Sequence, residues 1–154
     1  MSGYLAGTIY GVSSVQTTLQ QGMSTGQKVI LPNGKECTLV QNSSGGSTIA
    51  KNAALVLSLA SGALTVNATS AANTIATGVN DNANATIPAG SYFFMTERGL
   101  MYPLVAASVA AGAIVNPSGT SGTLAASTGT AAQQTNIQLL AASGTGGATA
   151  AYKS

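Results

Sequence analysis

Short apolar runs, separated by Gly, Pro or Asn, recur along most of the chain. The candidate strands are residues 28–31, 36–40, 54–60, 63–68, 73–79, 84–87, 91–97, 100–106, 113–115, 123–126, 136–142 and 148–153. Short strands repeated about every 8 to 12 residues are typical of a β-sandwich or barrel. Only residues 106–113 are rich enough in alanine for one helical turn. The pattern predicts an all-β fold over residues 26–154, a single compact β-sandwich or small, jelly-roll-like barrel.

The clearest local signal is a hairpin around Pro32, Asn33 and Gly34. Apolar residues 28–31 and 36–40 flank these three residues. Proline suits the second position of a type I turn, asparagine suits the third, and glycine then supplies the positive φ of a bulged hairpin. The sequence therefore predicts two antiparallel strands joined by this turn.

Further turns are predicted where glycine or proline interrupts apolar runs. Residues 61–62 separate two strand candidates, and residues 88–90 precede another. Residues 98–99, Arg-Gly, are expected to join the runs 91–97 and 100–106. Glycine and proline are the strongest local breakers of regular structure, which is the basis of these predictions.

Residues 1–25 differ from the rest of the chain. They carry no charge, and their apolar residues follow no helical spacing, while four glycines interrupt them. We interpret them as an extended N-terminal arm that needs a neighbouring surface. The predicted interface residues in the arm are Tyr4, Leu5, Ile9, Tyr10 and Val12. The alternative is that this segment forms the first strand of the same domain.

The composition favours a protein that works inside an assembly. The 27 alanines, 19 glycines, 17 serines and 19 threonines make up more than half of the 154 residues. Only 5% of residues are charged and the net charge is +2, against about 25% charged residues in typical soluble domains. Such a weakly charged surface suits permanent packing against other protein better than life as a free monomer. The alternative is a soluble domain coated with hydroxyl and amide groups.

Charge and hydropathy argue against two classes of partner. The five basic residues are scattered, so we expect no nucleic-acid partner. The longest apolar stretch, residues 100–115, is interrupted and falls short of the ~20 residues that span a bilayer, so we expect no membrane partner. Residues 1–23 contain no Lys or Arg, which is unlike a secretory signal.

Candidate chemistry is sparse. The chain has no histidine, the commonest general base and a frequent zinc ligand. The only acids are Glu36, Asp81 and Glu97, and the single cysteine, Cys37, is expected to be a small buried side chain. No phosphate-binding or dinucleotide-binding glycine pattern is present. We therefore expect no enzyme, cofactor, metal or small-molecule substrate; the enzyme alternative is a hydrolase that uses a carboxylate pair.

The order of segments resembles the small decoration, or cement, proteins on the heads of tailed bacteriophages. The similarity spans about residues 26–126, through the predicted hairpin, an "IA-GV" strand at 75–79, an "IPAG-Y-F" strand at 87–93 and an "AAG-A-LV"-like segment at 110–115. The resemblance implies a structural virion protein, made in the bacterial host cytoplasm. It would bind the capsid exterior and cross-link neighbouring major capsid subunits. It also implies a homo-oligomer on the shell, of a size that the sequence leaves open. A tail, fibre or surface-adhesion component is the alternative.

Overall fold

The computed structural model describes residues 12–43, 45, 47–70, 74–81, 86–127 and 136–154. This part of the chain forms twelve strands and no helical element, so the all-β prediction is confirmed. The strands are β1 (Lys28–Ile30), β2 (Glu36–Asn42), β3 (Ala54–Ala60), β4 (Ala63–Ala68), β5 (Gly78–Val79), β6 (Tyr92–Met101), β7 (Leu104–Val105), β8 (Ile114–Pro117), β9 (Thr123–Ala126), β10 (Ile137–Leu139), β11 (Gly147–Ala148) and β12 (Ala151–Lys153).

Five strands close into a small mixed barrel. Antiparallel pairs join β2 to β6, β6 to β5, β5 to β3 and β3 to β4, and a parallel pair between β4 and β2 closes the ring. Strand β1 adds to the free part of β2. The barrel interior is filled by one cluster of buried residues: Val40, Ile49, Ala53, Leu55, Val66, Ile87, Phe93 and Met95.

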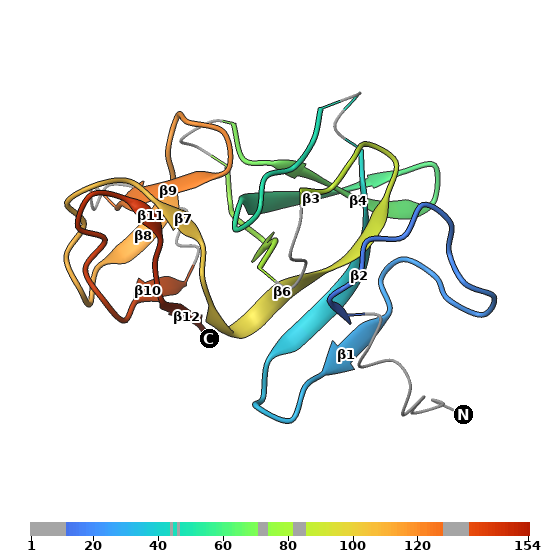
Figure 1. Cartoon of the computed structure of the whole chain (residues 1–154), viewed down its shortest axis with the longest axis horizontal. Coiled ribbons are helices and arrows are strands. Elements are labelled where there is room, and N and C mark those ends of the chain that lie inside the picture. Colours follow the sequence, from blue (N-terminus) through green and yellow to red (C-terminus); the bar gives the residue numbers. More distant parts are fainter. Residues whose placement is uncertain (1–11, 44, 46, 71–73, 82–85, 128–135) are drawn as a thin grey trace.

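A second sheet continues from the end of β6. The last three residues of β6 pair with β12, and the order then runs β10, β8, β9, β7 and β11. Figure 1 shows the two parts on either side of the long β6, with β1–β4 on one side and β7–β12 on the other. Barrel residues Ala54 and Val79 belong to the same buried cluster as Met101 and Leu124, so the two sheets share a core. The described residues therefore form one compact unit, a barrel with additional strands.

The predicted hairpin turn is confirmed. The Gly34 backbone N–H donates to the Leu31 carbonyl at 2.9 Å, and the Leu31 N–H donates to the Lys35 carbonyl at 2.9 Å. Gly34 has φ +78°, the left-handed conformation that glycine accepts without steric penalty. The side-chain oxygen of Asn33 also accepts the Lys35 N–H at 3.1 Å.

The predicted tight turn at residues 61–62 is also confirmed, because Ser61 and Gly62, with φ +50° and +79°, join β3 to β4 directly. Such paired positive φ values suit the right-handed twist of a two-residue hairpin. The turn before β6 is present as well, with the Ser91 N–H donating to the Pro88 carbonyl at 3.2 Å.

The predicted turn at Arg98-Gly99 is wrong, because β6 runs through both residues. Cys37 pairs with Thr96 and Glu36 pairs with Arg98, so β6 contains one extra residue at this point, a β-bulge. Gly99 has φ +92°, and a Cβ there would lie 3.1 Å from the Cα of Lys35. Glycine is therefore suited to this position, just after the bulge, by its positive φ and by the close approach of the hairpin turn.

The described part of the predicted arm, residues 12–25, lies against the barrel. Gln16 and Tyr92 exchange backbone hydrogen bonds of 2.9 and 2.7 Å, and the Thr25 hydroxyl accepts the Leu64 N–H at 3.0 Å. Val12 is only 5% exposed and clusters with Cys37, Leu39 and Phe94 on the outside of β2 and β6. The Val12 side chain is therefore part of the chain's own core, which differs from its predicted role as an interface residue. Tyr4, Leu5, Ile9 and Tyr10 lie outside the described residues.

Candidate functional site

Most of the charged side chains of this weakly charged chain gather at one place. Seven of the eight charged residues lie around the point where β6 passes from the barrel to the second sheet; they are Lys28, Lys35, Glu36, Asp81, Glu97, Arg98 and Lys153. We call this set the junction cluster. Its residues come from β1, the hairpin turn, β2, the segment after β5, β6 and β12. These charged residues are scattered along the sequence, and the fold brings them together.

Asp81 is the most buried member of the junction cluster. Lys35 Nζ lies 3.0 Å from both carboxylate oxygens, with the two side chains only 12% and 1% exposed. The carboxylate also accepts the Thr96 hydroxyl and the Tyr102 backbone N–H, the latter at 3.0 Å. A buried carboxylate needs this number of donors, since an unpaired buried charge is strongly unfavourable. Asp81 therefore ties the hairpin turn to β6 and to the start of the second sheet.

The other two acids also contact cations of the same chain. Glu97 lies 2.9 Å from Lys28 Nζ and accepts the Thr38 hydroxyl at 2.6 Å. Partial burial raises the pKa of Glu97, but the hydrogen bonds from Lys28 and Thr38 and the charges of Lys28 and Lys153 outweigh it, so that pKa lies below its ordinary value. Glu36 lies 3.9 Å from Arg98 near the surface. All three acids thus have structural partners, an arrangement that serves packing.

Lys153 belongs to the junction cluster, a position that the sequence alone does not predict. Its Nζ donates to the Thr77 carbonyl at 2.6 Å and to the Ala76 carbonyl at 3.4 Å. Burial lowers the pKa of Lys153, and the nearby Glu97 carboxylate partly opposes this effect. A lysine with a lowered pKa can serve catalysis, but this ammonium group holds the C-terminal strand against the segment that leads into β5. Its geometry supports a structural role.

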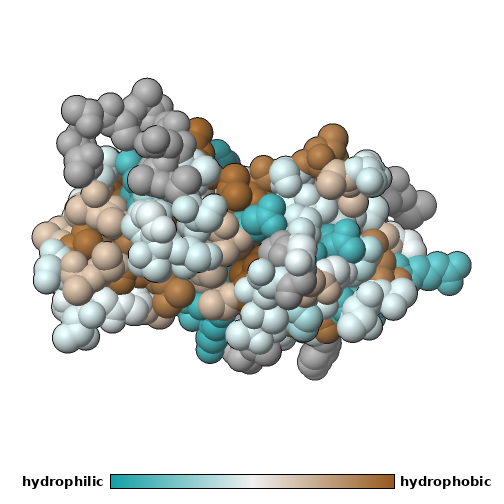
Figure 2. Space-filling model, turned by 90° about the horizontal axis from the view of Figure 1, so that it is seen from above, coloured by the Kyte–Doolittle hydropathy of each residue, from teal (hydrophilic) through white to brown (hydrophobic). Residues whose placement is uncertain are grey.

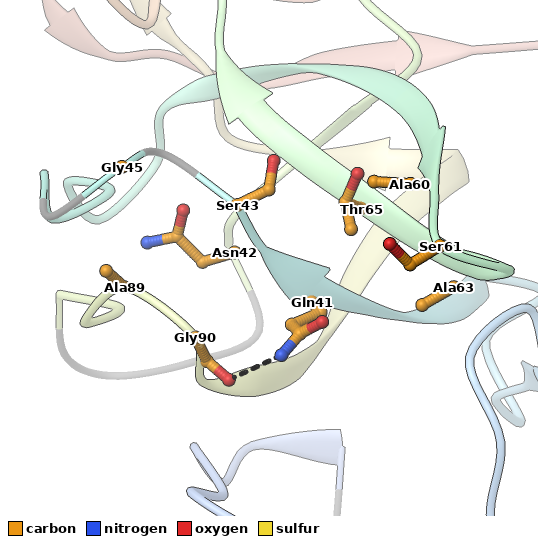
Figure 3. A pocket seen from close by; sticks show the side chains of 10 residues that line it. All are labelled: Gln41, Asn42, Ser43, Gly45, Ala60, Ser61, Ala63, Thr65, Ala89 and Gly90. Atoms are coloured by element: carbon orange, nitrogen blue, oxygen red, sulfur yellow. Dashed lines mark hydrogen bonds between the residues drawn. The ribbon is translucent and has the colours of Figure 1, made fainter.

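A shallow hollow of about 570 Å³ lies at one end of the barrel. It is lined by Gln41, Asn42, Ser43, Gly45, Ala60, Ser61, Ala63, Thr65, Ala89 and Gly90, none of which is charged. In Figure 3 the Gln41 amide reaches across to the Gly90 carbonyl, a hydrogen bond of 3.0 Å. The Asn42 amide donates to the carbonyls of Ser47 and Ile87 at 3.2 and 2.9 Å. These polar groups hold the loops at the barrel end together, and none of the ten described lining residues carries a titratable side chain.

Within the described residues, no three His, Cys, Asp or Glu side chains gather as a metal site would require. Cys37 is fully buried, as the sequence predicts, and lies in the apolar cluster outside β2 and β6. No described helix is long and apolar enough to cross a membrane.

One face of the second sheet exposes large apolar side chains. Five of the eight exposed large hydrophobic residues in the described part of the chain lie there: Leu100, Tyr102, Ile114, Leu140 and Tyr152. We call this surface the outer face. Sequence reasoning identifies the strands, but it does not show that these positions share one side. In the structure, burial alternates along β10, and at the end of β6 Leu100 is exposed between buried Gly99 and Met101, as expected for strands with one covered side.

One side of the molecule is mostly of intermediate hydropathy (Figure 2). Figure 2 shows one side of the molecule, where pale atoms of intermediate hydropathy predominate and teal, hydrophilic atoms occupy few places. Brown, hydrophobic atoms are visible on both halves. This distribution follows from a composition dominated by small residues and from the gathering of charges at the junction.

Comparisons of the chain with protein-family models, with curated proteins and with solved structures find no match. The resemblance to phage decoration proteins therefore stays a prediction.

Proposed function

We propose that this chain is a structural virion protein that binds the outer surface of a phage capsid and cross-links neighbouring major capsid subunits. The observation that carries the proposal is that most of the few charged side chains pair with one another within the chain and leave a weakly charged surface. Each of the three acids contacts a cation of the same chain, and much of the remaining surface is neutral, small or apolar. Weakly charged surfaces of this kind favour association with other protein over repulsion.

The mechanism is passive. A rigid β-unit presents fixed surfaces, so little conformational entropy is lost when it docks. Each copy adds a modest contact, and a copy that touches two subunits converts the second contact into an intramolecular event with a high effective concentration. Summed over a shell, such contacts oppose the outward pressure of packaged DNA. No step in this mechanism needs a titrating group, a metal or a cofactor.

The test uses heads of the encoding phage assembled without this protein. Such heads should form but release DNA at a lower temperature than complete heads. On dilution of external salt, which weakens the screening of DNA self-repulsion, they should release DNA at a salt concentration that complete heads still survive. Adding the purified protein should restore the original resistance, whereas bovine serum albumin at the same concentration should not. Heads that are equally resistant with and without the protein would contradict the proposed function.

A further inference from the structure

We propose that the outer face of the second sheet is covered by the same face of a second copy, giving a two-fold symmetric dimer. The two sheets would pack face to face, as the two layers of a β-sandwich do. This inference concerns self-association and does not require the proposed function. If that function holds, the dimer supplies two identical shell-binding surfaces and so explains how one particle bridges two subunits.

The register places the exposed side chains in one continuous patch. Leu100 is the direct antiparallel partner of Tyr152. Gln138 is the direct partner of both Tyr152 and Ile114. Direct partners in antiparallel strands point to the same side of a sheet, so these four residues form a row across β6, β12, β10 and β8.

A second row lies beside the first. Tyr102 and Leu140 are two positions along from Leu100 and Gln138, and side chains two apart point to the same side of an extended chain. The Leu140 N–H donates to the Ala150 carbonyl at 2.8 Å, so the hydrogen bonding between β10 and β12 continues as far as Leu140. Tyr102 and Leu140 are 45% and 55% exposed. The opposite side of the same strands carries the buried cluster that includes Met101, Leu139 and Ala151, so the outer face has no partner within the described chain.

The chemistry of the outer face is compatible with pairing to itself. In a two-fold interface the same patch meets its copy, so a charge near the axis is repelled by its twin. The two rows contain no charged residue. Their polar groups are tyrosine hydroxyls, which both donate and accept hydrogen bonds and can therefore match a second copy, and the Gln138 amide, whose nitrogen donates to the Gly112 carbonyl at 3.1 Å. Arg98, two positions before Leu100 on β6, lies 3.9 Å from Glu36.

The apolar area is also of the right size. Two half-exposed tyrosines and three partly exposed aliphatic side chains present on the order of 400 Å² of apolar surface per copy. Two copies would bury about 800 Å², which corresponds to about 1,400 Å² in total because such interfaces are about 57% apolar. Specific protein interfaces bury about 1,200 to 2,000 Å². Together with the polar surface that surrounds it, the outer face is therefore large enough for a dimer.

The test is sedimentation equilibrium of the full chain at several concentrations, with Tyr152→Lys as the main variant. Wild type should sediment as a concentration-dependent dimer. Tyr152→Lys places two like charges in the interface and should weaken dimerisation at least tenfold. The matched control is Leu59→Lys on β3, because Leu59 is 72% exposed and lies in the barrel, away from the outer face. The control should dimerise as wild type does.

A second measurement keeps the test valid if the lysine variant folds poorly. Tyr152→Cys should form a disulfide-linked dimer under mild oxidation, and Leu59→Cys should not. The native Cys37 is fully buried and does not interfere. Equal cross-linking of both variants would overturn the proposal.

The remaining outcomes of these experiments would show whether something other than a second copy covers the outer face. A wild type that is monomeric at all concentrations overturns the dimer. If Tyr152→Lys then also loses binding to capsid shells, the outer face is the shell contact. If deletion of residues 1–11 turns that monomer into a dimer, the chain's own N-terminal segment covers the face. Dimerisation without shell binding would instead leave this inference standing and remove the proposed function.

Discussion

Replacing Asp81 with asparagine removes the buried negative charge at the centre of the junction cluster while keeping the size of the side chain. The carboxylate is 1% exposed and faces a Lys35 ammonium group that is itself only 12% exposed. Asparagine can still accept one hydrogen bond from Thr96 or from the Tyr102 N–H, but it cannot neutralise the lysine. The variant therefore leaves an uncompensated positive charge against the barrel.

The expected loss follows from that unpaired charge. Breaking a buried ion pair by removing one partner lowers the free energy of unfolding by about 3 to 5 kcal/mol. For a protein of this length each kcal/mol lowers the melting temperature by about 2 to 4 °C, so Asp81→Asn should melt roughly 6 to 20 °C below wild type. The loss is a large part of the 5 to 15 kcal/mol that holds a typical domain together.

Urea unfolding followed by circular dichroism measures the effect, with Glu36→Gln as the matched control. Glu36 lies 3.9 Å from an Arg98 side chain that is 60% exposed, so its removal should change stability by less than about 1 kcal/mol. The double variant Lys35→Met, Asp81→Asn should recover part of the loss, because it removes both charges. A loss below 1 kcal/mol for Asp81→Asn, or an equal loss for Glu36→Gln, would refute the reasoning about burial.

Three further predictions concern the turn, the acid response and the N-terminal segment. Gly34→Val should lower stability by about 1 to 3 kcal/mol in thermal melts because φ there is +78°, although the position has open space; unchanged melting would show that the turn relaxes freely. Because the pKa of Glu97 is lowered in the folded state, its ionised form stabilises the fold at neutral pH, and this contribution is lost as pH falls below about 4.5 through the lower folded value. Glu97→Gln should therefore show a smaller loss of stability between neutral pH and acid than wild type, and parallel curves would contradict this. Deleting residues 1–11 should leave the melt nearly unchanged but weaken shell binding. Deleting residues 1–20 also removes Val12 from its buried cluster and should lower the melting temperature; identical melts of the two truncations would show that residues 12–20 are dispensable.

Local features of the fold are predictable from the sequence because their causes are local. The hairpin at Pro32, Asn33 and Gly34 needs only the turn preferences of these residues and two flanking apolar runs. The two-residue turn at Ser61 and Gly62 is found for the same reason. In both cases neighbouring residues decide the conformation, and the structure agrees.

Features that depend on register are not predictable in this way. Gly99 looks like a turn residue locally, but the pairing of β6 with β2 and β12 makes it part of a bulged strand. The parallel pairing of β2 with β4, which closes the barrel, also has no local signal.

The candidate sites are long-range in the same sense. Lys35 and Asp81 are 46 residues apart in the chain and meet only because the hairpin packs against β6. The outer face requires four strands in register before its apolar residues become one surface. The sequence alone therefore shows that histidine is absent and that charge is low. It does not show where the charged and exposed apolar side chains gather.

The measurement that tests the proposed function most directly is the titration of purified, labelled protein onto mature heads assembled without it. Capsid cementing predicts binding that saturates at a fixed ratio to major capsid subunits, with bound particles visible at repeated positions on the shell by electron cryomicroscopy. Binding that never saturates, or no binding to mature heads at any concentration, would contradict it.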